Sequence, residues 1–208
     1  MHTMSRQQAI AAVILAAGRS ARMGVLKPLL PLEGETIMER VVGLFRGAGI
    51  SDILVVVGYE SVRLAPVLEK MAVRYVVNED YQHGMFSSVQ AGVKHLGEGY
   101  RAFFLHPVDI PLIRGDTLKK LMAVFREERV DICRPCYQGK RGHPPLIAAT
   151  LIPHILTFAG PGGLRALLSR YMERSLDVAC DDPGVLIDMN TPENYEKIKK
   201  AIVENPSL

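Results

Sequence analysis

The chain has 208 residues, of which 48% are hydrophobic and 23% are charged, and its formal net charge is +3. This length predicts one large domain, and the apolar content is ample for its core. The basic residues are spread along the chain, which argues against a nucleic-acid or membrane-surface partner, and no apolar run is long enough to cross a bilayer. Three cysteines and the lack of an apolar leader before the first strand predict a reduced, cytoplasmic protein.

The first apolar run, residues 9–17, leads into a loop rich in glycine and basic residues. An uninterrupted apolar run is typical of a strand buried on both faces of a parallel sheet. Gly18 and Gly24 permit positive φ angles and close approach of backbone N–H groups to an anion. The loop also carries three cations: Arg19, Arg22 and Lys27. A buried strand that leads into such a loop indicates a phosphate-binding site.

Two familiar phosphate loops do not fit this spacing. The dinucleotide fingerprint is G-x-G-x-x-G, whereas Gly18 and Gly24 are six residues apart with no glycine between them. The P-loop, G-x-x-x-x-G-K-[ST], places a lysine directly after its second glycine, whereas Lys27 comes three residues after Gly24 and precedes Pro28. The pattern that remains, over residues 15–27, is L-A-A-G-x-S-x-R-M-G-x-x-K.

Residues 28–134 alternate between helical and strand patterns. Thr36 and Glu39 are spaced as a capping box, and the helix that follows would bury one face, made of Ile37, Val41, Leu44 and Phe45. Further helices are predicted at 61–71 (with a break near Pro66), 86–96 and 115–128, and strands at 52–57, 73–77, 101–105 and 130–134. This order implies right-handed crossovers and a parallel sheet. The predicted fold class is therefore α/β: a three-layer αβα sandwich around a doubly wound, mostly parallel sheet.

Shorter elements are predicted beyond residue 134. They are a cationic turn at 139–142, a strand at 143–147, helices at 150–158 and 162–171, one or two short strands within 178–187, and a final helix capped by Thr191 with Pro192 in its first turn. We find no repeat, low-complexity tract or linker. Residues 1–208 are therefore expected to form a single domain.

Asp109 follows the strand predicted at 101–105 and lies between two prolines that stiffen its loop. In an open α/β sheet the strand ends form the ligand crevice. A carboxylate opposite a cationic phosphate loop is well placed for Mg²⁺, which prefers one or two carboxylates with phosphate oxygens and water; the alternative is a loop aspartate that caps the next helix. His106 could be a metal ligand or general base, or could hydrogen-bond the loop backbone.

A second acidic segment, residues 188–190, stands before the final helix. Asp188 supplies a carboxylate, and the amide oxygen of Asn190 can also ligate Mg²⁺ but adds no negative charge. Either residue could instead cap the terminal helix.

Cys133 and Cys136 form a lone C-x-x-C motif. A zinc site would need a second pair of ligands, and a redox motif would start a helix. Pro135 and a downstream glycine indicate instead a strand that runs into a loop. We interpret the motif as incidental, with substrate-facing, redox and metal roles as the alternatives.

The pattern L-A-A-G-x-S-x-R-M-G-x-x-K resembles the signature of the MobA-like nucleotidyltransferases, which attach a nucleoside monophosphate to a phosphorylated acceptor. Its L-A-A-G form is similar to the molybdopterin cytidylyltransferase branch, whereas the guanylyl branch usually has two glycines after Leu-Ala. The resemblance runs from residue 15 to residue 192, with the motifs in the family's order. It implies a nucleotidyltransferase-type Rossmann-like fold, with the nucleotide in the N-terminal half and the acceptor in the C-terminal half.

The resemblance also assigns roles to individual residues. It implies nucleotide contacts from Leu15, Ala16, Ala17, Gly18, Arg19, Ser20, Gly24 and Ser88, and catalytic roles for Arg22, Lys27 and Asp109. Ser88 and Val89 match a Ser-Val pair that reads the base in related cytidylyltransferases. Two serines at a helix start also serve as caps, and both roles can coexist.

Three segments match family motifs for the metal and the acceptor. Asp109 matches an Asp-x-Pro motif, and Asp188 matches the first acid of Asp-Ile-Asp-Thr-Pro, whose second acid is replaced here by Asn190. Whether Asp188 or Asn190 completes a Mg²⁺ site with Asp109 stays open. His143 lies in a Gly-His-Pro match on the acceptor side. Arg165 either holds the acceptor or is an exposed helix residue.

The reaction implied by the resemblance is a Mg²⁺-dependent transfer of CMP from CTP to the phosphate of molybdenum cofactor, with release of pyrophosphate. Its partners would be CTP, molybdenum cofactor and a molybdoenzyme that receives the product. The same chemistry with GTP, or with a sugar or choline-type phosphate, is one alternative. A non-catalytic carrier of molybdenum cofactor is another, although a carrier needs neither Lys27 nor Asp109. The missing glycine fingerprint disfavours a nicotinamide dehydrogenase.

Overall fold

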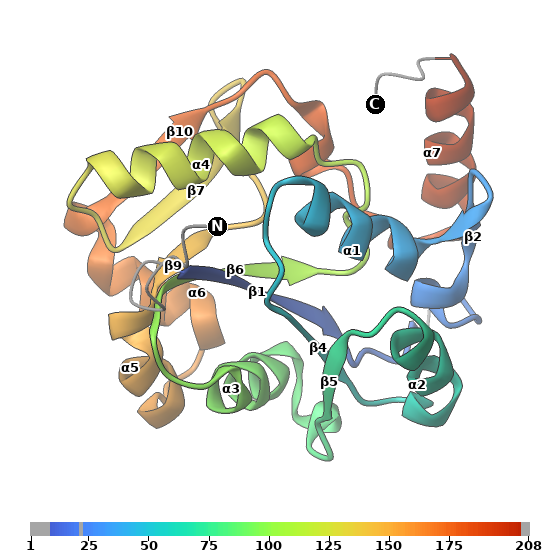
Figure 1. The fold of residues 1–208 in the computed structure, drawn as a ribbon, viewed down its shortest axis with the longest axis horizontal. Helices are drawn as coiled ribbons and strands as arrows, with labels where there is room; N and C mark the ends of the chain where they lie inside the picture. The colour runs from blue at the N-terminus through green and yellow to red at the C-terminus, as the bar shows by residue number, and fades with distance from the viewer. Residues whose placement is uncertain (1–8, 21–22, 205–208) are drawn as a thin grey trace, which may run out of the picture.

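The computed structural model describes residues 9–20 and 23–204 (Figure 1). Its centre is an eight-stranded sheet in the order β10–β7–β9–β6–β1–β4–β5, with β8 paired to β7. The strands of this sheet are β1 (Ala9–Ala16), β4 (Ile53–Val57), β5 (Arg74–Val77), β6 (Tyr100–Pro107), β7 (Ile132–Tyr137), β8 (Lys140–Arg141), β9 (Leu146–Ala148) and β10 (Ser175–Ala179). A separate hairpin pairs β2 (Pro31–Leu32) with β3 (Glu35–Thr36).

Helices cover both faces of the sheet (Figure 1). The α-helices of the described chain are α1 (Ile37–Gly47), α2 (Ser61–Lys70), α3 (Met85–Leu96), α4 (Gly115–Glu127), α5 (Ile152–Thr157), α6 (Gly163–Leu168) and α7 (Pro192–Glu204). Helices α1, α2, α4 and α7 contribute to the core on one face, and α3, α5 and α6 to the core on the other. The predicted three-layer αβα sandwich is therefore confirmed. No described helix is long and apolar enough to span a membrane.

Strand β1 is buried on both faces, as its apolar composition predicts. Its residues alternate between the two cores, with Ile14 on the side of α1 and Val13 and Leu15 on the side of α3. It runs parallel to both neighbours, β4 and β6, so the carboxyl ends of the three strands meet at one edge of the sheet. The backbone N–H of Val108 donates to the carbonyl of Leu15 at 3.0 Å, which joins the loop after β6 to the end of β1.

Local sequence signals predicted helix α1 well. The side chain of Thr36 accepts from the backbone N–H of Glu39, and the carboxylate of Glu39 accepts from the backbone N–H of Thr36, so the capping box is confirmed. Leu44 is only half-buried, and Val42 takes its expected place in the core. The break predicted near Pro66 is wrong, because α2 continues through this residue. A proline there forfeits a single backbone hydrogen bond, which the packed helix tolerates.

Predictions for the C-terminal part were less accurate. The strand expected at 143–147 starts only at Leu146 and runs antiparallel to β6 and β7. Of the one or two short strands expected within 178–187, the segment holds the end of one, β10, and then a 3₁₀ turn (Pro183–Leu186). The helix expected at 162–171 becomes a 3₁₀ turn after Leu168.

The N-terminus of α4 is capped by a residue that no sequence signal indicated. Asp116 lies in the first turn of this helix, but the buried carboxylate of Asp182 accepts from the backbone N–H of Arg114 at 2.9 Å and from the hydroxyl of Thr117 at 2.7 Å. The backbone N–H of Gly184 also donates to Asp182, at 3.0 Å. This aspartate therefore joins the segment after β10 to α4.

Candidate active site

A cavity of about 310 Å³ opens at the carboxyl ends of β1 and β6. It is walled by the loop after β1, the loop after β6 and the start of α3. Its lining includes Leu15, Ala16, Ala17, Gly18, Ser20, Lys27, Tyr81, Ser88 and Asp109. The fold thus gathers most of the predicted nucleotide-binding residues around one space. Tyr81 was not singled out from the sequence, where it is one aromatic residue in a polar loop.

Lys27 is the most constrained charged residue of this cavity. It is 8% exposed, and its Nζ atom donates to Asp109 Oδ2 at 2.9 Å and to Asn190 Oδ1 at 2.9 Å. The backbone N–H of Met189 donates to the carbonyl of Asp109 at 2.9 Å, which holds the two loops together. The sequence left open whether Asp188 or Asn190 acts together with Asp109. In the structure Asn190 and Asp109 both accept a hydrogen bond from Lys27. Asp188 makes no ion pair within the described chain and lines a separate hollow beside α7.

The loop after β1 turns at residues other than those expected. Gly24 has a φ angle of +65°, as predicted, but Gly18 does not adopt positive φ, and Ser20 does so instead at 49°. The carbonyl of Ser20 accepts from the backbone N–H groups of Met23 and Gly24 at 2.8 and 3.2 Å. Apart from its chain neighbours, no atom of the described residues lies within 4 Å of the position that a Cβ at Gly18 would take, so this glycine opens space rather than bending the chain. The predicted catalytic residue Arg22 lies outside the described residues.

Arg19 and Gly24 line a neighbouring hollow rather than the main cavity. The guanidinium of Arg19 lies 5.7 Å from the ring centroid of Tyr81 and 6.0 Å from that of Tyr59. Such cation–π contacts favour arginine over the ring faces. The structure therefore separates these two residues from the other predicted nucleotide ligands.

His106 belongs to the core rather than to the cavity surface. It is fully buried, packs edge-on against Phe45 at 5.4 Å, and neither ring nitrogen has a hydrogen-bond partner within the described residues. Burial, aided by the nearby His143, lowers its pKa to about 3. The backbone of Ile110, in the loop after β6, acts on the ring and opposes this shift, so the expected contact with the loop backbone is present in part, without a hydrogen bond of ordinary geometry. The neutral ring packs in the core.

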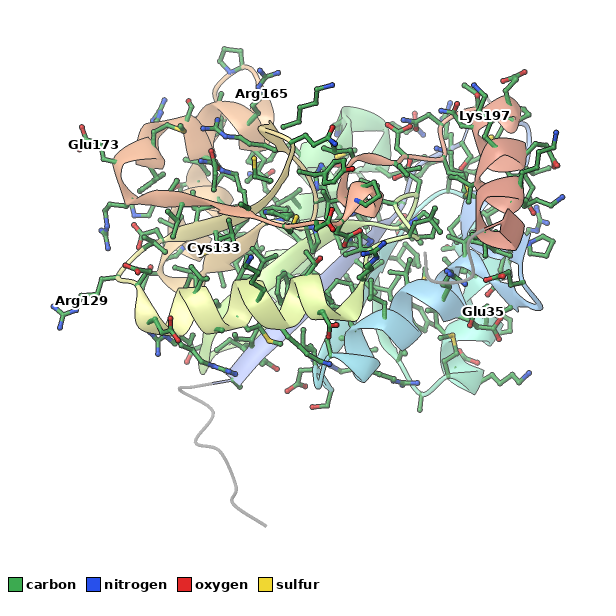
Figure 2. The ribbon with its side chains drawn as sticks, turned by 90° about the horizontal axis from the view of Figure 1, so that it is seen from above. Glu35, Arg129, Cys133, Arg165, Glu173 and Lys197 are labelled. Atoms are coloured by element: carbon green, nitrogen blue, oxygen red, sulfur yellow. The ribbon has the colours of Figure 1, made fainter. Side chains whose placement is uncertain are left out.

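The two predicted acceptor residues have different surroundings. His143 lies close enough to Asp109 and Asp188 for their charges to act on its ring; the surrounding protein lowers its pKa, and these carboxylates oppose the shift. Arg165 is exposed on the short helix α6, and Figure 2 shows it at the outer surface. Of the two, the structure thus links His143 to the carboxylates.

The two cysteines of the C-x-x-C motif share strand β7. Cys133 is buried inside the molecule (Figure 2), and burial raises its pKa to about 11. Cys136 is half-buried three residues further on, which places it on the opposite face of the strand. The predicted strand context is confirmed, and the two thiols do not face one partner.

A loop of backbone N–H groups after the first strand, a buried lysine and a carboxylate after the neighbouring parallel strand define a class: α/β proteins that bind nucleotides at the carboxyl edge of the sheet. A model of one family in this class, the MobA-like NTP transferase domain, matches residues 12–175. The chain belongs to this family and is a nucleotidyltransferase.

Curated relatives cover nearly the whole chain. It is 29% identical to the purine catabolism protein PucB of Bacillus subtilis (strain 168), over 91% of this chain and 96% of that protein. It is 26% identical to the molybdenum cofactor cytidylyltransferase of Escherichia coli (strain K12), over 94% and 98% of the two chains. It is also 26% identical to the molybdenum cofactor guanylyltransferase of Xanthomonas euvesicatoria pv. vesicatoria (strain 85-10), over 98% and 100%.

Solved structures share the fold. The structure of Rv0371c from Mycobacterium tuberculosis H37Rv has a TM-score of 0.81 and 23% identity, covering 93% of this chain and 99% of that one. A second structure of that mycobacterial protein, at a TM-score of 0.78 and 22% identity, is a complex with manganese and covers 93% and 100% of the two chains. A nucleotidyl transferase of Methanothermobacter thermautotrophicus has a TM-score of 0.79 and 26% identity, covering 94% and 98%.

Proposed function

We propose that the protein is a Mg²⁺-dependent cytidylyltransferase that transfers CMP from CTP to the phosphate of molybdenum cofactor and releases pyrophosphate. The observation that carries this proposal is the convergence of Asp109 and Asn190 on the ammonium group of Lys27, beside a cavity that Ala17 and Ser88 also line. Two full-length relatives are named for nucleotidyl transfer to molybdenum cofactor. The L-A-A-G form of the first loop supports CTP over GTP.

The donors present in the cavity fit a divalent cation. Asp109 Oδ2 and Asn190 Oδ1 both lie 2.9 Å from one cationic centre, the Nζ atom of Lys27. Carboxylate and amide oxygens are ligands that Mg²⁺ prefers, and the ion usually takes its remaining ligands from phosphate and water. Asp109 and Asn190 would therefore hold the ion, which when bound supplies positive charge beside the phosphates.

The reaction requires alignment and charge neutralisation more than proton removal, because the acceptor phosphate is already ionised near neutral pH. Lys27 and the backbone N–H groups of residues 18–20 would hold the triphosphate and stabilise the charge that develops on the leaving pyrophosphate. His143 and Arg165 would meet the acceptor. In this proposal residues 1–208 act as one domain, with the nucleotide in its N-terminal half and the acceptor in its C-terminal half. The product would pass to a molybdoenzyme in the cytoplasm.

Two measurements test this proposal. Thermal unfolding is followed with each nucleoside triphosphate, with and without Mg²⁺, because a ligand at about one hundred times its Kd adds about 2.7 kcal/mol to the free energy of unfolding. Pyrophosphate release is then measured with CTP or GTP, with and without molybdenum cofactor. We expect a Mg²⁺-dependent stabilisation by CTP, and pyrophosphate release only when CTP and the cofactor are both present.

The other outcomes point to the alternatives. A larger stabilisation by GTP would overturn the base assignment and leave nucleotidyl transfer standing. Binding of molybdenum cofactor without pyrophosphate release would favour a carrier. Release with a sugar or choline-type phosphate, and not with molybdenum cofactor, would change the acceptor.

A further inference from the structure

Ser88, in one wall of the cavity, belongs to a network of three polar side chains that also includes Asn78 and Ser87 behind that wall. Asn78 follows β5, and both serines lie in the first turns of α3. Asn78 Nδ2 lies 2.9 Å from Ser87 Oγ and 3.0 Å from Ser88 Oγ. Asn78 and Ser88 are only 5% and 4% exposed, and Ser88 lines the cavity. The polarity of these hydrogen bonds therefore decides what Ser88 offers to a ligand.

The orientation of the Asn78 amide is determined by the backbone. The N–H group of Asp80 donates to Asn78 Oδ1 at 3.0 Å. A backbone N–H can only donate, so a flipped amide would oppose two donors. The oxygen of Asn78 must therefore face Asp80, and its NH₂ group must donate to the two serine hydroxyls.

The two serines then differ in what they do with their single hydroxyl proton. Ser87 donates to the carbonyls of Asp80 and Gly84, at 2.8 and 2.9 Å. Ser88 accepts from Asn78, and its own proton has no acceptor among the described residues. A hydroxyl has one proton that it can donate and two lone pairs that can accept. The hydrogen bond that Ser88 still lacks is therefore one in which it is the donor. Because Ser88 lines the cavity, the acceptor has to come from the ligand.

We propose that Asn78 determines nucleobase selectivity by making Ser88 a hydrogen-bond donor toward the cavity. This inference rests on the proposed function, in which a pyrimidine nucleotide occupies that cavity. Cytosine presents two adjacent acceptors, N3 and O2, whereas uracil carries a proton on N3 and is otherwise nearly the same shape. A donor at Ser88 suits the first edge better than the second. The expected preference for CTP over UTP is on the order of tenfold, the effect of one buried hydrogen-bonding group.

The test is the substitution Asn78→Asp, which replaces the NH₂ donor by an oxygen of nearly the same size. The carboxylate would accept the Ser88 proton, so Ser88 would present lone pairs to the cavity. The Kd values of CTP and UTP are measured by titration calorimetry with Mg²⁺ and no acceptor. We expect the wild-type preference to fall to within about twofold or to reverse. The added charge weakens both ligands alike because they carry the same triphosphate, so the ratio of the two Kd values reports the base alone.

Three further variants show whether the effect passes through Ser88. Ser88→Ala alone should remove the preference, and Asn78→Asp added to it should not change the ratio further. Ser87→Ala is the matched control and should keep the wild-type ratio, because Ser87 does not line the cavity. If Asn78→Asp does not fold, judged by circular dichroism, Asn78→Ala serves instead and should lower the ratio part of the way.

The outcomes separate this inference from the function on which it rests. A merely structural role for Asn78 would weaken CTP and UTP equally; an unchanged ratio in Asn78→Asp, with wild type preferring CTP, overturns the inference alone. A shift that persists in the Ser88→Ala background also overturns it. A wild-type protein that binds neither pyrimidine triphosphate overturns the proposed function and this inference together.

Discussion

Charged side chains are arranged differently in two regions of the molecule. One region is the cavity at the end of β1, and the other is the group of strands β7, β8 and β10 at one end of the sheet. In the cavity, a buried lysine holds Asp109 and Asn190 from two distant loops. On strands β7, β8 and β10, Asp177 accepts from Arg134 Nε at 2.9 Å and from Arg141 Nε at 2.8 Å. The side chain of Arg134 is 13% exposed, but those of Asp177 and Arg141 are 33% and 49% exposed, so it is the pair with Arg141 that lies open to solvent.

This difference in burial predicts how each region tolerates change. A buried polar group that loses its partner retains its full desolvation cost, whereas exposed ion pairs are typically worth less than about 1 kcal/mol. The cavity should therefore be intolerant of substitution and the outer strands tolerant. Two relatives, each 26% identical to this chain, are named as a cytidylyltransferase and a guanylyltransferase. Their names differ in the nucleotide alone, as expected if base preference can vary around a common phosphate site.

The largest effect is expected from Lys27→Met. Loss of the ammonium group removes the cation beside Asp109 and should lower kcat by a factor of about 10²–10³, as for other single electrostatic groups in active sites. The measurement is pyrophosphate release, with circular dichroism to show that the fold persists. Lys199→Met is the matched control, because Lys199 is exposed and contacts Glu196 and the ring of Tyr195 on its own helix, away from the cavity. Turnover near the wild-type value in Lys27→Met would contradict the claim that the cavity tolerates substitution less than the other region.

The second test concerns burial beneath the cavity. Burial lowers the pKa of His106 to about 3 because it disfavours the charged form, whereas a histidine in the unfolded chain has its usual pKa of 6.5. Between these values only the unfolded chain binds the proton, so the free energy of unfolding falls as the pH falls. His106 should contribute a loss of about 2 kcal/mol between pH 7.5 and pH 5.

Urea unfolding at the two pH values measures this loss. His106→Leu should remove that part of the pH dependence, because leucine has no proton to bind. His83→Leu, at an exposed histidine, should keep the wild-type dependence because His106 is still present. If the free energy of unfolding falls by the same amount in wild type and in His106→Leu, the conclusion that His106 is buried and neutral in the folded protein is wrong.

A third test examines the packing that supports the cavity. A Cβ at Gly92 in α3 would lie 2.6 Å from Val13 Cγ1 and 2.9 Å from Val56 Cγ2. Gly92→Ala should therefore cost about 1–3 kcal/mol through overpacking, measured by urea unfolding. Gly43→Ala is the matched control, since Gly43 lies in α1 with no atom within 4 Å of its Cβ position, and alanine there should add about 0.5–1 kcal/mol. A neutral Gly92→Ala would mean that α3 does not rest directly on β1 and β4.

The smallest effect is expected on the acceptor side. Arg165 is exposed, so Arg165→Gln should raise the KM for the acceptor by about two- to tenfold, in a salt-dependent way, and leave kcat and the Kd of CTP unchanged. Steady-state kinetics at two salt concentrations measure this. A hundredfold loss of kcat would place Arg165 at the reacting atoms and contradict the expectation that exposed charges matter less than the buried Lys27.

Much of the fold was predictable because its signals are local. The apolar run of β1, the capping box at Thr36 and the alternation of helices with strands depend on residues within a few positions of one another. The same local reading predicted a phosphate loop after β1 and a carboxylate after β6, and parallel β1 and β6 bring these together. It did not predict that Ser20 rather than Gly18 would take the left-handed conformation, because that choice depends on how the loop closes against Lys27.

The class of the protein follows from local sequence: an apolar first strand, its glycine-containing cationic loop and the order of the elements are properties of neighbouring residues. Which side chains meet depends on tertiary packing instead. Lys27 reaches Asn190 across 163 positions, Asp182 caps a helix 65 positions away, and Asn78 donates to Ser88 from the loop after β5. Such contacts depend on how helices and loops pack against the sheet. Packing between distant segments leaves no repeating pattern in a single sequence from which it could be predicted.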